Sequence, residues 1–120
     1  MRPLALAVTL GLVALVGLAV PAQTAPGTGT FAVVNVEVSG VKIWLPSAIV
    51  VRPGQQVTLK LDNKLDAPHG FSIDDYAIQV VVPAGGTQDV TFTAKRGLTS
   101  RFYCQIHPPH VGGQIIVISN

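Results

Sequence analysis

The feature that most constrains the fold of this chain is a series of short segments in which apolar and polar residues alternate. Gln55–Asp62 (QQVTLKLD) places its Val and Leu residues on one face, and Thr87–Ala94 (TQDVTFTA) alternates in the same way. A period of two residues indicates a strand with one buried face. Thirty of the 98 residues after position 22 are Val, Ile or Thr, which favour strands, and no long stretch has helical periodicity. The sequence therefore argues against an all-helical fold and, through its apolar content, against intrinsic disorder.

Turn signals separate these segments at short intervals. Pro53-Gly54 and Pro83–Gly86 each fall between two apolar stretches, and Asp74–Tyr76 interrupts the strand segments Gly70–Ile73 and Ala77–Val82. Many short strands with turns at this spacing are typical of a two-layer or closed β-structure. We predict an all-β fold, a Greek-key sandwich or barrel of seven to eight strands.

The front of the chain has the pattern of an export signal. Arg2 supplies positive charge, Leu4–Val20 is apolar apart from one Thr and two Gly, and Val20-Pro21-Ala22 offers small residues for cleavage after Ala22. We therefore predict a signal peptide at residues 1–22. The 17-residue apolar run is also at the short edge of the length that spans a bilayer, so an uncleaved N-terminal anchor is the alternative. Either interpretation places the domain outside the cytoplasm, in the periplasm or a similar compartment.

The remainder of the chain reads as one small domain behind a linker. Residues 23–30 (QTAPGTGT) have the composition of a flexible linker, and we assign residues 31–120 to the domain. Seven Lys and Arg against six Asp and Glu after position 22 leave it nearly neutral, with no basic run. This balance argues against nucleic acid as a partner. A membrane enters only if the N-terminal segment stays uncut, and the oligomeric state is not predicted.

The single cysteine and the histidines concentrate in two loops. Cys104 cannot form an internal disulfide, so in an oxidising compartment it pairs between chains, reacts or binds a metal, unless it is an inert buried residue. His107 and His110 follow it by three and six residues, and His69 precedes a predicted strand. The spacing lets these side chains converge, although each histidine taken alone is most simply a surface or hydrogen-bonded residue. We also expect Asn63 to brace the loop before His69 through its amide.

A thiolate with two or three imidazoles is a donor set for copper or, less specifically, for zinc. The chain lacks the paired CxxC of most structural zinc sites. Export and a β-sandwich favour copper. We predict one copper ion per chain.

Three segments carry a family resemblance: residues 69–74 (HGFSID), Val90–Ala94 (VTFTA) and 104–108 (CQIHP). From Pro46 to the C-terminus the chain resembles the cupredoxins, most closely nitrosocyanin-like red copper proteins. It is also similar to the cupredoxin domain of nitrous oxide reductase, but position 108 is Pro where that domain has a second Cys. The resemblance implies that His69, Cys104 and His107 are the main copper ligands.

The chain departs from the blue copper pattern at the weak fourth position. Blue copper proteins usually place a Met there, whereas this chain has His110, and its only Met is Met1. The predicted ligand set is therefore His69, Cys104, His107 and His110. An imidazole donates more strongly than a thioether, so we expect a red or green protein with a lowered reduction potential. The alternative for His110 is a solvent-facing residue at the mouth of the site.

The expected function is one-electron transfer, an electron carrier rather than a catalyst. Apolar residues near the ligands, Phe71, Pro108, Pro109 and Val111, are candidates for a surface that docks a redox partner protein. The alternatives are a small-molecule redox site for nitric oxide or oxygen, as the nitrosocyanin resemblance implies, and a periplasmic copper carrier.

Overall fold

The computed structural model describes residues 16–22, 26–106 and 109–119 of the 120-residue chain. Within these residues there are nine strands and one short 3-10 helix, η1. Residues 16–22 have no regular secondary structure, and none of the helices in the described part is both long and apolar enough to cross a bilayer. The elements in chain order are β1 (Thr28–Val38), β2 (Val41–Leu45), β3 (Ala48–Val51), β4 (Gln56–Asn63), β5 (His69–Ile73), η1 (Asp74–Tyr76), β6 (Ile78–Val82), β7 (Thr87–Thr93), β8 (Thr99–Phe102) and β9 (Gly113–Val117).

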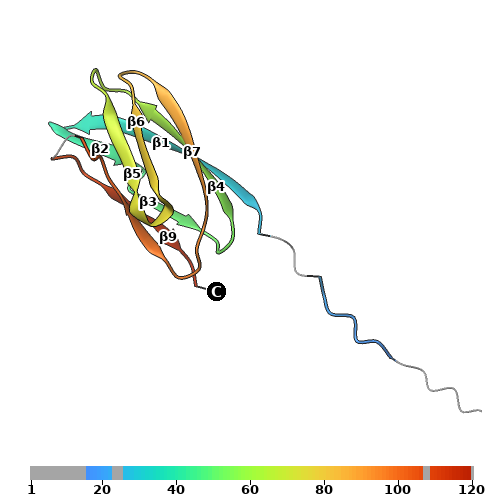
Figure 1. Ribbon diagram of the computed structural model, residues 1–120. Helices are drawn as coiled ribbons and strands as arrows, with labels where there is room; N and C mark the ends of the chain where they lie inside the picture. The colour runs from blue at the N-terminus through green and yellow to red at the C-terminus, as the bar shows by residue number, and fades with distance from the viewer. Residues whose placement is uncertain (1–15, 23–25, 107–108, 120) are drawn as a thin grey trace, which may run out of the picture.

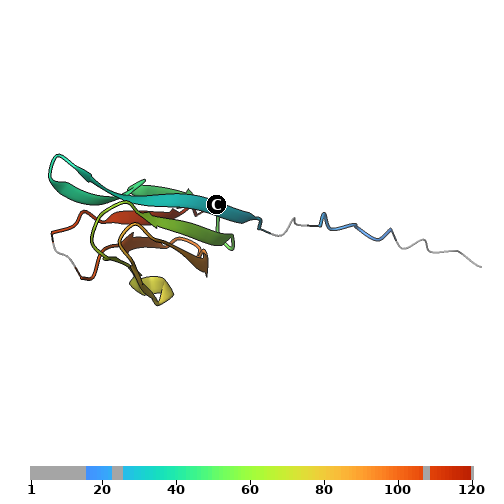
Figure 2. The same cartoon turned by 90° about the horizontal axis from the view of Figure 1, so that it is seen from above.

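The strands form a two-layer β-sandwich (Figures 1 and 2). One layer is a four-stranded sheet in the order β2-β1-β4-β7. The other contains the three-stranded sheet β3-β9-β8 and the hairpin β5-β6. β1 pairs with β4 and β3 pairs with β9 in parallel, whereas the remaining pairs are antiparallel. The prediction of an all-β sandwich is confirmed.

The described residues contain nine strands, one more than the upper end of the predicted seven to eight, and η1 lies at the predicted interruption between Gly70–Ile73 and Ala77–Val82. Asp74–Tyr76 forms a 3-10 turn, and Ala77 follows it in the left-handed conformation with φ of 52°. This geometry reverses the chain. β5 and β6 consequently pair as two antiparallel strands, with Ile73 opposite Ile78.

The linker prediction for residues 23–30 also needs correction at its end. β1 already begins at Thr28, and residues 23–25 lie outside the described part. Thr28 pairs with Gln56, and the parallel ladder continues to Asn35 opposite Asn63. The polar sequence TGT becomes a strand because β4 supplies its backbone hydrogen-bond partners, which composition alone does not reveal.

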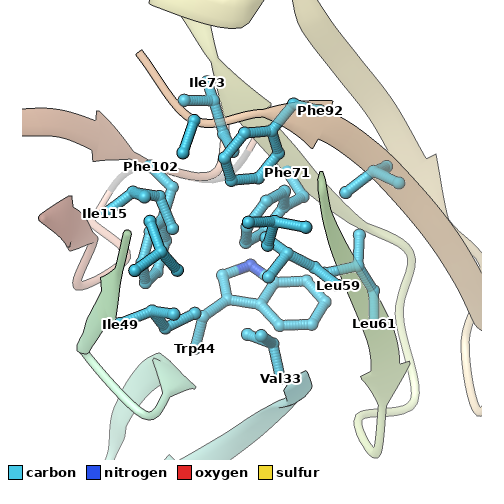
Figure 3. Packing of buried hydrophobic residues seen from close by; sticks show 14 of the residues in the cluster. Val33, Trp44, Ile49, Leu59, Leu61, Phe71, Ile73, Phe92, Phe102 and Ile115 are labelled. Carbon is cyan, nitrogen blue, oxygen red and sulfur yellow. The ribbon is translucent and has the colours of Figure 1, made fainter. Parts of the chain in front are cut away.

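The core lies between the two layers and has aromatic side chains at its centre (Figure 3). Trp44 is completely buried and meets Phe71 edge-on, with ring centroids 5.4 Å apart. Phe71 in turn stacks on Phe102 at 5.1 Å. The alternation in β4 directs Val57, Leu59 and Leu61 into the same core, as the period of two predicts.

Gly113 at the start of β9 has no room for a side chain. A Cβ atom there would overlap the Ser47 carbonyl oxygen and the Phe102 ring. We expect Gly113→Ala to lower the free energy of unfolding by about 1–3 kcal/mol, because backbone must move to relieve the overlap. Urea denaturation measures the loss. Gly27→Ala is the matched control, since a Cβ atom at Gly27 meets nothing within 4 Å; equal effects of the two variants would contradict this packing.

Candidate metal centre

Three of the four predicted ligands meet at one end of the sandwich. His69 is the first residue of β5, Cys104 lies two residues beyond β8, and His110 lies three residues before β9. One potential ligand atom from each residue lies within 4.8 Å of the other two. The Cys104 Sγ atom is 3.9 Å from Nδ1 of His69. The fourth predicted ligand, His107, is outside the described residues.

A backbone bridge between β5 and the segment after β8 brings the thiol to His69. The Ser72 N–H donates to the Tyr103 carbonyl at 2.8 Å, and the Tyr103 N–H donates back to the Ser72 carbonyl at 3.1 Å. The Gly70 N–H then points at Cys104 Sγ, at 3.2 Å. This contact fixes the position of the sulfur atom beside the start of β5.

Gln105 covers the other side of Gly70. Its amide oxygen accepts a hydrogen bond from the Ser72 hydroxyl at 2.9 Å, and its NH2 group donates to the Val80 carbonyl at 2.9 Å. A Cβ atom at Gly70 would overlap this amide. Glycine at position 70 therefore leaves room for the Gln105 side chain, which attaches the segment after Cys104 to the β5-β6 hairpin.

His110 is held against the opposite sheet. Its neighbour Val111 donates its N–H to the Lys42 carbonyl at 2.9 Å, which attaches the segment to β2. The His110 ring lies 6.3 Å from the Trp44 ring and 5.3 Å from the His69 ring, measured between centroids. The cluster therefore lies where the segment before β9 is attached to the four-stranded sheet through β2. Cys104 and His69 are buried, and His110 is partly exposed.

The structure confirms that Asn63 braces the loop before His69. Its NH2 group donates to the Ala67 carbonyl at 2.8 Å, and its Oδ1 accepts from the Leu65 N–H at 3.2 Å. Sequence analysis missed the adjacent Asn35, which contacts both Asn63 and His110. The available signal was an asparagine in the inward phase of β1, two residues after Val33.

The docking residues expected near the ligands divide into two groups. Val111 is 43% exposed and Pro109 is exposed, as a surface patch requires. Phe71 is fully buried in the core, so its assignment to a docking surface was wrong. The inward face of β5 packs against Trp44, which leaves Phe71 no access to solvent. Pro108 lies outside the described residues.

The donor set fits a soft transition-metal ion. Thiolate and imidazole bonds to an ion such as zinc are about 2.0–2.3 Å long, so two donors on one ion lie about 3.3–4 Å apart. The 3.9 Å between Cys104 Sγ and His69 Nδ1 agrees with this separation. No carboxylate belongs to the described cluster, and sulfur with imidazole nitrogen is a combination that suits copper.

A cavity of about 390 Å³ opens beside the cluster. Cys104 and His110 form part of its wall, and the Arg101 guanidinium carbon lies 4.5 Å from the Tyr103 ring centroid at another part of the wall. The Tyr103 hydroxyl donates to the Asp74 carboxylate at 2.9 Å, and this hydrogen bond raises the pKa of Tyr103 above its usual value. The remaining lining residues are Gly40, Val41, Pro109 and Val111.

The fold and the donor set together define a β-sandwich domain with a Cys/His metal site. The sequence matches the cupredoxin-like domain family over residues 8–117, and the chain belongs to this family. Among curated proteins, no sequence matches it significantly. Family membership and the His/Cys/His cluster support copper as the cofactor.

Solved structures share the fold at low sequence identity. A copper nitrite reductase from Nitrosomonas europaea superimposes with a TM-score of 0.66 and 18% identity, covering 78% of this chain and 42% of that protein. The multicopper oxidase mgLAC gives a TM-score of 0.61 and 17% identity, over 78% of this chain and 39% of the oxidase. This chain thus spans about two fifths of the length of either protein.

Replacing Asn63 tests how much its buried amide contributes to the free energy of unfolding. We expect Asn63→Ala to lower the free energy of unfolding by at least about 2 kcal/mol, because each buried polar group left unpaired costs about 1–3 kcal/mol. Asp62→Ala is the neighbouring control, since its ion pair with Lys64 is partly exposed and such pairs contribute about 0–1 kcal/mol. Urea denaturation of both variants gives the comparison. A loss for Asn63→Ala no larger than the control's would show that the brace is dispensable.

Proposed function

We propose that this chain is an exported mononuclear copper protein whose Cys/His site transfers single electrons. The observation that carries the proposal is the convergence of Cys104, His69 and His110 at the end of the sandwich. Copper would supply the one-electron change between Cu(II) and Cu(I). His107 belongs to the proposed ligand set because of its C-x2-H spacing to Cys104. The N-terminal signal pattern supports the extracytoplasmic location.

The surroundings of the proposed ligands suit a site whose charge changes while its structure does not. His69 begins a strand that is buried at every residue, and the Gly70 N–H is fixed on the sulfur atom of Cys104. Hydrogen bonds attach the two ligand loops to both layers of the sandwich, through Tyr103 and Val111. Such a frame limits the rearrangement that accompanies electron gain or loss.

The donor set supports a red copper protein of the nitrosocyanin type. The only Met is Met1, so no thioether from the domain is available to the site, and up to three imidazoles accompany one thiolate. Imidazoles stabilise Cu(II) relative to Cu(I), which lowers the reduction potential compared with a Met-containing site.

The surface around the site supports a redox partner protein. Val41 and Val111 are 47% and 43% exposed and line the same cavity as His110. Apolar contacts at the rim of a metal site allow a partner to approach it closely without a strong charge requirement.

Copper reconstitution tests the function. We expect one equivalent of Cu(II) to bind and to give an intense sulfur-to-copper absorption band, because Cys104 supplies a thiolate ligand. Cys104→Ser should abolish this band, whereas Thr58→Ser, on the far side of the four-stranded sheet from the site's loops, should leave it unchanged. Metal analysis and visible spectroscopy measure both effects. A band unaffected by Cys104→Ser would refute the site. A spectrum dominated by absorption in the red, with narrow EPR hyperfine splitting, would refute the imidazole-rich assignment.

The cavity favours a second candidate function, a redox site for a small molecule. A space of about 390 Å³ with Cys104 and His110 in its wall is large enough to admit a diatomic molecule or azide. Such a ligand would reach the donor cluster directly from solvent.

Filling the cavity separates the two candidates. If a small molecule uses this route, azide or nitric oxide should change the charge-transfer bands of the wild-type Cu(II) protein, and Val41→Trp should suppress the change. Val81→Trp is the matched control, because Val81 is also 47% exposed but lies on β6, away from this cavity. Titrations followed by visible spectroscopy compare the three proteins. Wild-type bands that do not respond to either ligand would leave the electron carrier as the function.

A further inference from the structure

We propose that Asn35 is a positioning residue of the metal centre. By accepting a hydrogen bond from Nε2 of His110, it fixes the imidazole tautomer in which Nδ1 is the nitrogen that binds the metal. The inference rests on the proposed copper site and adds to it the atom through which His110 acts. Its basis is a chain of donors and acceptors that begins at backbone carbonyls and ends at the imidazole.

The chain begins at Asn63, whose amide can adopt only one orientation. Its Nδ2 atom lies 2.8 Å from the Ala67 carbonyl oxygen, 3.1 Å from that of Pro83 and 3.2 Å from that of Val82. Carbonyl oxygens only accept hydrogen bonds, so the NH2 group must face them. Oδ1 therefore faces the opposite way, where the Leu65 N–H donates to it at 3.2 Å.

This orientation determines that of Asn35. The atom of Asn35 that lies 3.1 Å from Asn63 Oδ1 must be a donor, which makes it Nδ2. Oδ1 of Asn35 then points at His110, with 2.9 Å between Oδ1 and Nε2. Both asparagines are completely buried, so flipping either amide would set two oxygens or two NH2 groups against each other without water to relieve them.

The tautomer of His110 follows from the last link. An oxygen that can only accept requires a hydrogen on Nε2, and a neutral imidazole with its hydrogen on Nε2 has its lone pair on Nδ1. Nδ1 of His110 lies 3.2 Å from the Val111 carbonyl oxygen. A carbonyl cannot donate to a lone pair, so this contact does not compete with a metal ion for Nδ1.

The same amides connect the two ligand loops. Asn35 and Asn63 are register partners in the parallel β1–β4 pair, so the sheet itself holds them side by side. The NH2 group of Asn63 also donates a hydrogen bond to the carbonyl of Ala67, two residues before His69. Loss of a group that orients a histidine ligand costs about 10–100-fold in metal affinity. We expect Asn35 to contribute at the lower end of this range, because His110 is one ligand of several.

The tautomer can be read directly in the wild-type protein. We would label histidine with 15N and record long-range 1H–15N spectra of the full chain, metal-free and loaded with diamagnetic Zn(II). The expected result is a protonated Nε2 for His110 in both states, with Nδ1 shifting when zinc is added. A metal-bound or unprotonated Nε2 would overturn the proposal.

A variant tests whether Asn35 is the cause. Asn35→Leu preserves the volume and removes the acceptor, so metal-free His110 should populate both tautomers, and Cu(II) affinity should fall about 10-fold. Affinity is measured by competition with a chelator, using the fluorescence of the single Trp44, whose ring lies 6.3 Å from that of His110. Ser100→Ala, which removes a buried hydroxyl with no hydrogen-bond partner in the described structure, should change neither reading.

The outcomes distinguish this inference from the proposed function. If wild-type protein fails to bind Cu(II), the copper function fails, while the metal-free spectrum still reports the His110 tautomer. If Asn35→Leu folds and retains both a single Nε2–H tautomer and wild-type affinity, the positioning role is refuted. If the variant does not fold, the wild-type spectra alone decide the proposal.

Discussion

The metal centre depends on the backbone bridge that joins the β5–β6 hairpin to the second sheet. The reciprocal hydrogen bonds between Ser72 and Tyr103 position the chain so that the next residue, Cys104, faces Gly70 at the start of β5. Without this bridge, the hairpin and the β3-β9-β8 sheet share no strand pairing in the described structure. The thiol and His69 lie 35 residues apart in the chain, and this pairing is what makes them neighbours.

Buried polar side chains carry the remaining precision of the site. Sandwich cores are built mainly from apolar contacts, which tolerate small displacements, whereas a hydrogen-bonded amide accepts only one arrangement of donors and acceptors. Asn35 and Asn63 are completely buried at the end of the β1–β4 ladder. Their presence is costly to a core unless every group is paired, and the pairs found here end at both ligand loops.

The sequence predicts the fold well where each strand carries its own evidence, as in β4 and β7. It fails at Thr28–Thr30, where a polar segment becomes a strand only because β4 lies beside it. The ligand cluster was predictable, because the single cysteine and all three histidines of the chain fall in two loops that a β-sandwich can bring to one end. Asn35 was not, because its partner His110 is 75 residues away and no local pattern reports a contact between them.

The parallel course of β1 alongside β4 determines which way the centre faces. Residues 16–22 lead towards the first residues of β1 (Figure 1). Asn35, seven residues beyond Thr28 along that strand, contacts His110. At about 3.3 Å per residue, this separates the start of the strand from the ligands by roughly 23 Å. Any attachment at the front of the chain would thus hold the domain at the start of β1, at the opposite end of the strand from the cluster. An approaching protein could then reach the ligands without competing with the attachment for the same face.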